Sequence, residues 1–173
     1  MRSNFSQKYK SELYHFIDQA LKEDIGSGDH SGKSCITETA KSSAKLLVKE
    51  EGVLAGMELA KVIFHQYDPN LTFHPLIEEG AYVTKGAVPF EVEGNTQSIL
   101  ATERLILNCL QRMSGIATLT NKLSQKIKHT SCRLLDTRKT TPNFRYPEKW
   151  AVQIGGGTNH RMGLFDALMI KDN

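Results

Sequence analysis

The sequence predicts an α+β N-terminal domain over residues 1–113, followed over residues 114–173 by an α/β barrel that is incomplete in this chain. Three observations predict this fold class. The chain opens on an amphipathic helical pattern, and several short strand patterns then follow one another closely. The last forty residues have the order strand, polar loop, helix, glycine turn and strand, which is typical of a βα unit.

The first predicted element is a helix from about Ser6 to Asp24. Its apolar residues follow the spacing that buries one helical face: Leu13, Phe16, Ile17, Ala20 and Leu21. Glycines at positions 26 and 28 are expected to end the helix. Residues 29–31, Asp-His-Ser, are expected to form a loop with local side-chain caps.

The sequence pattern in the middle of the N-terminal domain predicts several strands and one helix. Alternating apolar residues indicate a strand over Ser43–Lys49. A small-residue turn over residues 52–56 leads into a helix over about Met57–Tyr67, which ends at Asp68-Pro69. Three further strands are expected, over residues 71–77, 81–84 and 88–93.

One segment of this region suggests a competing function. Residues 79–86, Glu-Gly-Ala-Tyr-Val-Thr-Lys-Gly, resemble the hairpin of biotinyl and lipoyl carrier domains. Those carriers need a lysine for modification at a tight exposed hairpin tip, and no such site is found. The preferred interpretation is therefore a structural, hammerhead-like sheet.

A long helix is predicted after the strands. Asn95 or Thr96 caps it, and it runs to about Met113. Four residues are expected to face the core: Ile99, Leu100, Leu107 and Leu110. Ser114-Gly115 is expected to break the helix, and a second one is predicted over residues 116–128. Arg104 lies in the middle of the first helix, where an arginine is usually a surface residue with a partly buried stem.

The C-terminal stretch carries two polar clusters, each after an apolar run. Asp136–Pro142 follows Leu134-Leu135, and Lys171–Asn173 follows residues 167–170. Between the clusters lie a predicted helix, a glycine turn and a polar tripeptide: Glu148–Ile154, Gly155–Gly157 and Asn159–Arg161. In βα barrels the chemistry takes place on the loops at the C-terminal ends of the strands, where both clusters would fall.

The excess positive charge lies in this stretch. The chain has a net charge of +3; residues from Arg133 onward contain seven Lys/Arg and four Asp/Glu, while the other 15 and 15 balance. Five residues are predicted to converge: Arg138, Lys139, His160, Arg161 and Lys171. Fixed like charges repel unless an anion lies among them, and arginine suits carboxylates and phosphates. This favours a small polyanionic ligand over a solvated basic loop.

Composition excludes several other classes of protein. No apolar run reaches the roughly 18 residues of a membrane helix, and the N-terminus lacks a signal-peptide pattern. Three scattered cysteines do not form a zinc or disulfide pattern, and neither Cys109 nor Cys132 has a nearby histidine to activate it. No basic stripe with interleaved aromatics suggests nucleic acid. The expectation is a cytoplasmic protein with no membrane or nucleic-acid partner.

Three motifs resemble the quinolinate phosphoribosyltransferase family (nicotinate-nucleotide pyrophosphorylase, carboxylating) in sequence, order and spacing: Asp136–Pro142, Gly155–Arg161 and Ile170–Asn173. The resemblance extends to residues 23–29, 52–56 and 103–108. It implies transfer of phosphoribosyl from phosphoribosyl pyrophosphate to the pyridine nitrogen of quinolinate, with loss of the 2-carboxylate. The implied products are nicotinate mononucleotide, carbon dioxide and pyrophosphate, in NAD biosynthesis.

The resemblance also implies roles for individual residues. Arg104, Arg138, His160 and Arg161 resemble the quinolinate binders. Lys139 and Lys171, the catalytic candidates, resemble lysines that contact both substrates, and Asp172 matches a position near the ribose and the metal. Asn143 stands where the family often has Gly, and Ser31 where it often has Thr.

The resemblance further implies Mg²⁺ and a homodimer. The metal would neutralise the leaving pyrophosphate, and its ligands are expected downstream of this sequence. In the dimer, Arg104 of one subunit would complete the site of its neighbour. Because a closed barrel needs more strands than are present, the 173 residues are expected to be a truncated form of a longer enzyme that lacks turnover alone.

Two alternatives to this enzyme stay open. One is a non-catalytic anion-binding fragment, which keeps the cations but lacks the acids for metal and ribose chemistry. The other is a related pyridine phosphoribosyltransferase with another substrate.

Overall fold

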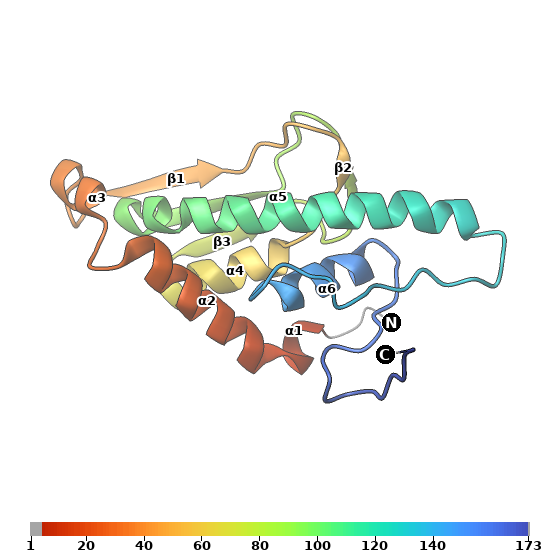
Figure 1. The fold of residues 1–173 in the computed structure, drawn as a ribbon. Coiled ribbons are helices and arrows are strands. Elements are labelled where there is room, and N and C mark those ends of the chain that lie inside the picture. The colour runs from red at the N-terminus through yellow and green to blue at the C-terminus, as the bar shows by residue number, and fades with distance from the viewer. Residues whose placement is uncertain (1–4, 173) are drawn as a thin grey trace.

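A computed structural model describes residues 5–172. Its helices are α1 (Phe5–Lys8), α2 (Lys10–Ile25), α3 (His30–Cys35), α4 (Met57–Tyr67), α5 (Thr96–Ile127) and α6 (Arg145–Ile154). Its strands are β1 (Lys41–Lys45), β2 (Gly52–Val53), β3 (Thr72–Pro75), β4 (Tyr82–Val83) and β5 (Phe90–Asn95). Figure 1 shows α5 running along the length of the molecule.

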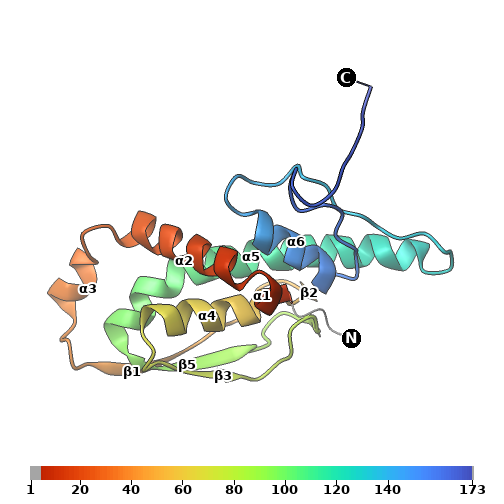
Figure 2. The same ribbon diagram turned by 90° about the horizontal axis from the view of Figure 1, so that it is seen from below.

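The strands form two small antiparallel sheets, so the expected α+β region is confirmed. One sheet has the order β1-β5-β3, and the other pairs β2 with β4. In the larger sheet, Val92 of the central strand lies opposite Ala44 and Phe73. Figure 2 shows this sheet on one side of the molecule, with α4 between it and α2.

The core lies where α2, α4, α5 and β5 meet. Its most deeply buried apolar side chains are Ile17, Leu59, Ile63, Val92 and Met113. The helix predicted over residues 57–67 is confirmed at both ends, because its buried face follows helical spacing and Asp68 is already extended. The single helix predicted over about Ser6–Asp24 is helical in the structure but is divided at Tyr9 into α1 and α2.

The break expected at Ser114-Gly115 is wrong, because α5 is one helix of 32 residues. It is about 48 Å long at 1.5 Å per residue. Met113 and Ala117 on either side of the pair are fully buried, and Ser114 Oγ exchanges hydrogen bonds with the backbone of Ala55. One helical glycine costs only about 1 kcal/mol, which this packing outweighs. The division of the chain at residue 113 stays a prediction.

The start of α5 agrees with the sequence, whereas its buried face differs in part. Asn95 is the cap, and its side chain accepts a hydrogen bond from Ser98 N (3.0 Å). Ile99 and Leu110 are buried as expected, but Leu100 is 44% exposed. Residues 102, 106 and 109 complete the buried face instead.

Two local predictions are corrected. His30 and Ser31 begin the short helix α3 rather than lying in a loop. The expected local cap is confirmed at Asp29, whose Oδ1 accepts a hydrogen bond from Gly32 N (2.9 Å). The strand predicted over Ser43–Lys49 is Lys41–Lys45, because its pairing with β5 extends to Asn95. Even α5, the longest described helix, lacks an apolar stretch that could cross a bilayer, and the shorter described helices lack one too.

Gly155 allows the end of α6 to pack directly on α5. A Cβ placed there would collide with the Ala117 carbonyl oxygen and lie 2.7 Å from Thr120 Cβ. We expect Gly155→Ala to lower the free energy of unfolding by about 1–3 kcal/mol through overpacking. Urea denaturation measures this change.

The matched control is Gly115→Ala in the interior of α5. A Cβ at Gly115 meets nothing within 4 Å, so this substitution should raise the free energy of unfolding by about 0.5–1 kcal/mol. A Gly155→Ala protein as stable as wild type would contradict the close approach of the two helices.

Candidate functional site

The candidate site lies where α6 connects two short extended segments. Leu135 and Thr158 form a parallel bridge, and Asp136 N donates to Thr158 O (3.2 Å). The polar segments 136–142 and 159–161 therefore begin at the same edge, as loops do at the carboxyl ends of parallel strands. The first two groups of predicted site residues therefore start side by side, and their roles in a site stay a prediction.

The second strand of the predicted βα unit is misplaced. It was expected at residues 167–170, whereas the parallel partner of Leu135 is Thr158, directly after the glycine turn. Leu168 and Ile170 are 99% and 98% exposed, and Figure 2 shows the C-terminal segment leading away from the helices. No described strand lies beside residues 167–170 to pair with them, so they stay irregular.

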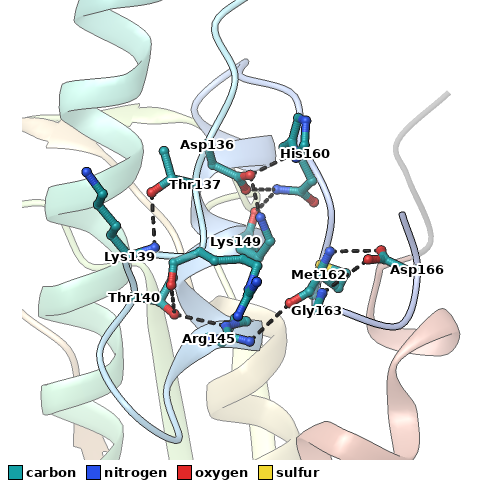
Figure 3. Close-up of polar contacts among 12 residues, drawn as sticks. Asp136, Thr137, Lys139, Thr140, Arg145, Lys149, His160, Met162, Gly163 and Asp166 are labelled. Carbon is teal, nitrogen blue, oxygen red and sulfur yellow. Dashed lines mark hydrogen bonds and ion pairs between the residues drawn. The ribbon is translucent and has the colours of Figure 1, made fainter. Parts of the chain in front are cut away.

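Asp136 is the centre of a buried polar network (Figure 3). Its carboxylate forms an ion pair with Lys149 Nζ, and the two side chains are only 6% and 1% exposed. Asn159 Nδ2 donates to Asp136 Oδ2 (2.6 Å) and to Lys149 O (2.7 Å). His160 N donates to Asp136 Oδ1 (2.8 Å). One carboxylate thus ties both polar segments to α6.

A second network fixes the far end of the first segment. Glu148 Oε1 accepts hydrogen bonds from Arg112 Nε (3.0 Å) and Nη2 (2.7 Å). The same carboxylate accepts from Thr141 N (3.2 Å) and Thr141 Oγ1 (2.8 Å). Since Arg112 belongs to α5, this network attaches the segment to the long helix as well as to α6.

Arg145 and Asp166 hold residues 162 and 163, which directly follow the second segment (Figure 3). Arg145 Nε donates to Thr140 Oγ1 (3.0 Å), and its Nη1 donates to Met162 O (3.2 Å). The Asp166 carboxylate accepts from Met162 N (2.8 Å) and Gly163 N (3.1 Å). These backbone hydrogen bonds, that of Met162 first, lower the pKa of Asp166 because they favour its charged form.

The backbone of Asn143 explains one departure from the family pattern. Its φ is +62°, the left-handed region that glycine adopts without strain. Asparagine enters this region more readily than most other residues, so it can serve where the family often has glycine.

Three predicted cations and His160 lie on these two segments and remain available to a ligand. Arg138, Lys139, His160 and Arg161 form no ion pair with any carboxylate in residues 5–172. Arg138 is half-buried, and its Nε is buried without a hydrogen-bond partner in that range. Unpaired cations held on one edge favour an anionic ligand.

Three predicted site residues are not brought to this cluster by contacts within residues 5–172. Lys171 and Asp172 are exposed on the irregular C-terminal segment and make no described hydrogen bond or ion pair with the other predicted residues. Arg104 is exposed on α5, eight residues before Arg112, which is about 12 Å along a helix. Their assignment to the site stays a prediction.

The described residues offer neither a readily ionised thiol at Cys109 nor a group of side chains that could hold a metal ion. Burial raises the pKa of the Cys109 thiol to about 12, which disfavours the reactive thiolate. No three His, Cys, Asp or Glu side chains gather within residues 5–172 in a way that could hold a metal ion.

Two open clefts lie beside the first segment rather than over the predicted cations. One, of about 710 Å³, lies between α2 and α5, and Arg112 and Thr141 contribute to its lining. The other, of about 1060 Å³, lies between α2 and the start of α6. Neither of these two clefts is lined by Arg138, Lys139, His160 or Arg161.

Sequence reasoning assigned no role to four residues that build the site: Arg112, Glu148, Lys149 and Asn159. A partial signal exists for Lys149, which adjoins Trp150 and Ala151 on the buried face of an amphipathic helix. For Arg112 and Glu148 the sequence offers none, because their contact joins residues 36 positions apart.

Comparison with known proteins places both parts of the chain. Residues 29–114 match the family model described as quinolinate phosphoribosyl transferase, N-terminal domain. Residues 116–173 match the model described as quinolinate phosphoribosyl transferase, C-terminal domain.

Similar individual proteins have related names. The chain is 47% identical over 163 residues to quinolinate phosphoribosyltransferase [decarboxylating] 1 of Nicotiana glauca, covering 94% of this chain and 46% of that protein. It is 48% identical over 163 residues to the chloroplastic nicotinate-nucleotide pyrophosphorylase [carboxylating] of Arabidopsis thaliana, with the same two shares. The chain thus spans about half the length of the curated relatives it matches.

A solved structure has the same fold. The nicotinate-nucleotide pyrophosphorylase from Francisella tularensis matches with a TM-score of 0.85 and 41% sequence identity. The match covers 94% of this chain and 57% of that one. The likeness therefore includes both the α+β region and the segment that carries the predicted cations.

Proposed function

The chain belongs to the quinolinate phosphoribosyltransferase family, and on that premise we propose that it forms part of an enzyme acting on quinolinate and phosphoribosyl pyrophosphate. The reaction joins ribose C1 to the pyridine nitrogen and releases pyrophosphate. The 2-carboxylate leaves as carbon dioxide, a proton takes its place, and nicotinate mononucleotide remains. The observation that carries this proposal is the set of unpaired cations at one edge, held by the buried Asp136 network.

The cations suit the two substrates in different ways. Quinolinate has two adjacent carboxylates, and the planar forks of Arg138 and Arg161 can each form two parallel hydrogen bonds with a carboxylate. His160 lies between the Asp136 network and Arg161 in the second segment. Lys139 and Lys171 are the proposed catalytic residues, because a compact ammonium can follow charge as it develops on phosphate and carboxylate oxygens.

The proposal also includes a homodimer in which the two subunits share their sites. We place Arg104 in the site of a neighbouring subunit of a homodimer, since its own chain leaves it exposed on α5 and away from the other cations. Asp172 is proposed to lie near the ribose. The α/β barrel itself is a further proposal, supported by the parallel bridge between Leu135 and Thr158.

Magnesium and cell location stay predictions. The described residues do not gather into a metal cage, so the proposed steps involve only the two substrates and the residues named above. Cytoplasmic location is proposed from the sequence alone; some similar plant proteins are named as chloroplastic or mitochondrial.

The proposal predicts turnover by the full-length protein that carries this sequence. Quinolinate labelled in its 2-carboxylate should release labelled carbon dioxide only when phosphoribosyl pyrophosphate is present. Nicotinate in place of quinolinate should give no nucleotide, because it lacks the second carboxylate that the arginines would bind.

Each alternative has its own result in this assay. Thermal protection by quinolinate without any release would favour a non-catalytic anion-binding protein. Nucleotide formation from nicotinate would favour a related phosphoribosyltransferase with another substrate. Either result would contradict the proposed reaction.

A further inference from the structure

Lys149 is the most deeply buried charged residue of the described chain. It is 1% exposed, among the apolar residues of α6 and next to Trp150. Lysine is almost never fully buried unless it is paired, because removing an ammonium from water is costly. Its partner is the buried carboxylate of Asp136. Since Lys149 has almost no exposed surface, it cannot contact a substrate in this arrangement.

Asp136 connects this buried charge to the ligand-binding segments. It is the first residue of the segment with Arg138 and Lys139, and it accepts a hydrogen bond from the backbone N–H of His160 (2.8 Å). Asn159 adds two hydrogen bonds, to Asp136 and to the backbone of α6. One carboxylate and its donors therefore join the two segments beyond the point where the backbone pairing of Asp136 with Thr158 ends.

The ion pair between Lys149 and Asp136 also prevents a negative charge from standing alone beside an anion-binding site. An unneutralised carboxylate beside the cations would compete with a dianionic ligand for them and would repel it. Lys149 cancels that charge from the buried side and leaves the cations unpaired. An apolar pair of similar volume can be equally stabilising, but it could not accept the N–H of His160.

We infer that Lys149, Asp136 and Asn159 form a positioning unit for anion binding. The unit sets the spacing between the segment of Arg138 and that of His160, and it keeps Asp136 electrically neutral toward the ligand. Lys149 and Asn159 are positioning residues, since they act through Asp136. The inference deepens the proposed function and rests on it.

Calorimetric titration of quinolinate into full-length variants tests the unit, at a temperature well below each unfolding transition. Lys149→Met, of similar shape but uncharged, should weaken binding by roughly tenfold to a hundredfold through misplaced segments and the bare carboxylate. The double variant Lys149→Met/Asp136→Asn should bind more tightly than Lys149→Met, because the bare charge is gone. Asn159→Ala, which leaves the ion pair intact, should fold normally and bind more weakly than wild type.

The control separates positioning from general stability. Ile63→Ala removes buried apolar contacts in α4, away from the site, so it should lower the melting temperature without changing the affinity for quinolinate. A Lys149→Met protein that binds like wild type would overturn the inference. So would a double variant that binds no better than Lys149→Met, or wild-type affinity in Asn159→Ala if Lys149→Met fails to fold. Failure of wild type to bind quinolinate would instead overturn the proposed function.

Discussion

Replacing Arg138 by alanine is expected to weaken quinolinate binding by at least about thirtyfold in the full-length protein. Losing one partner of a buried charge pair costs about 2–5 kcal/mol, and about 1.4 kcal/mol corresponds to a factor of ten. Arg138 is half-buried and its Nε has no hydrogen-bond partner within the described chain, so its guanidinium is free to meet a carboxylate. Stability should hardly change, because no described ion pair is lost.

Calorimetric titration measures this loss, and two variants control it. Arg133→Ala removes the same charge from an exposed position three residues before Asp136. It therefore measures how far the loss of one positive charge at a distance weakens quinolinate binding without any loss of direct contact. Arg138→Lys keeps the charge but loses the fork and should lie between wild type and Arg138→Ala. A change of less than about threefold, equal to about 0.6 kcal/mol, would remove Arg138 from the site.

Arg161→Ala should have a smaller effect than Arg138→Ala. In the free chain, Arg161 Nη1 already donates to Ala167 O (3.1 Å), and its Nη2 lies 3.7 Å from Met169 Sδ. Binding a carboxylate would exchange these contacts for new ones, which reduces the net gain.

Mixing two impaired variants, Arg104→Ala and Arg138→Ala, is expected to restore activity measured at a quinolinate concentration too low to saturate either variant. If Arg104 completes the neighbour's site, a mixed dimer contains one site with both arginines intact. Random exchange of subunits makes half of the dimers mixed, so about a quarter of all sites should be intact. Release of carbon dioxide from labelled quinolinate, followed as the two proteins equilibrate, measures the recovery.

The matched control mixes Arg138→Ala with Arg161→Ala. Both residues belong to the same segment pair of one chain, so no mixed dimer contains an intact site and no activity should return. Mass spectrometry of differently tagged subunits shows whether exchange has taken place. Exchange without recovery in the Arg104→Ala and Arg138→Ala mixture would show that the site is not shared in the proposed way.

Several features of the fold follow from local sequence alone. The helix at residues 57–67 is correct at both ends, since its buried spacing and the extended Asp68 are local signals. Local sequence also limits the cap of α5 to Asn95 or Thr96, and the structure has Asn95. The prediction failed at Ser114-Gly115, where a local helix-breaking signal is outweighed by packing against residues 55 and 56.

The sequence by itself determined the family to which this chain belongs. The motifs with Arg138, Lys139, His160 and Arg161 identify the family, and the positive charges in them indicate an anionic ligand. Both conclusions need only residue types and their spacing, which can be seen in the sequence without the fold. Only the tertiary structure decided how these residues are held. Lys149 meets Asp136 from 13 positions away, and Arg112 meets Glu148 from 36. Whether a charge is buried, and beside which partner, depends on elements that come together only when the chain folds.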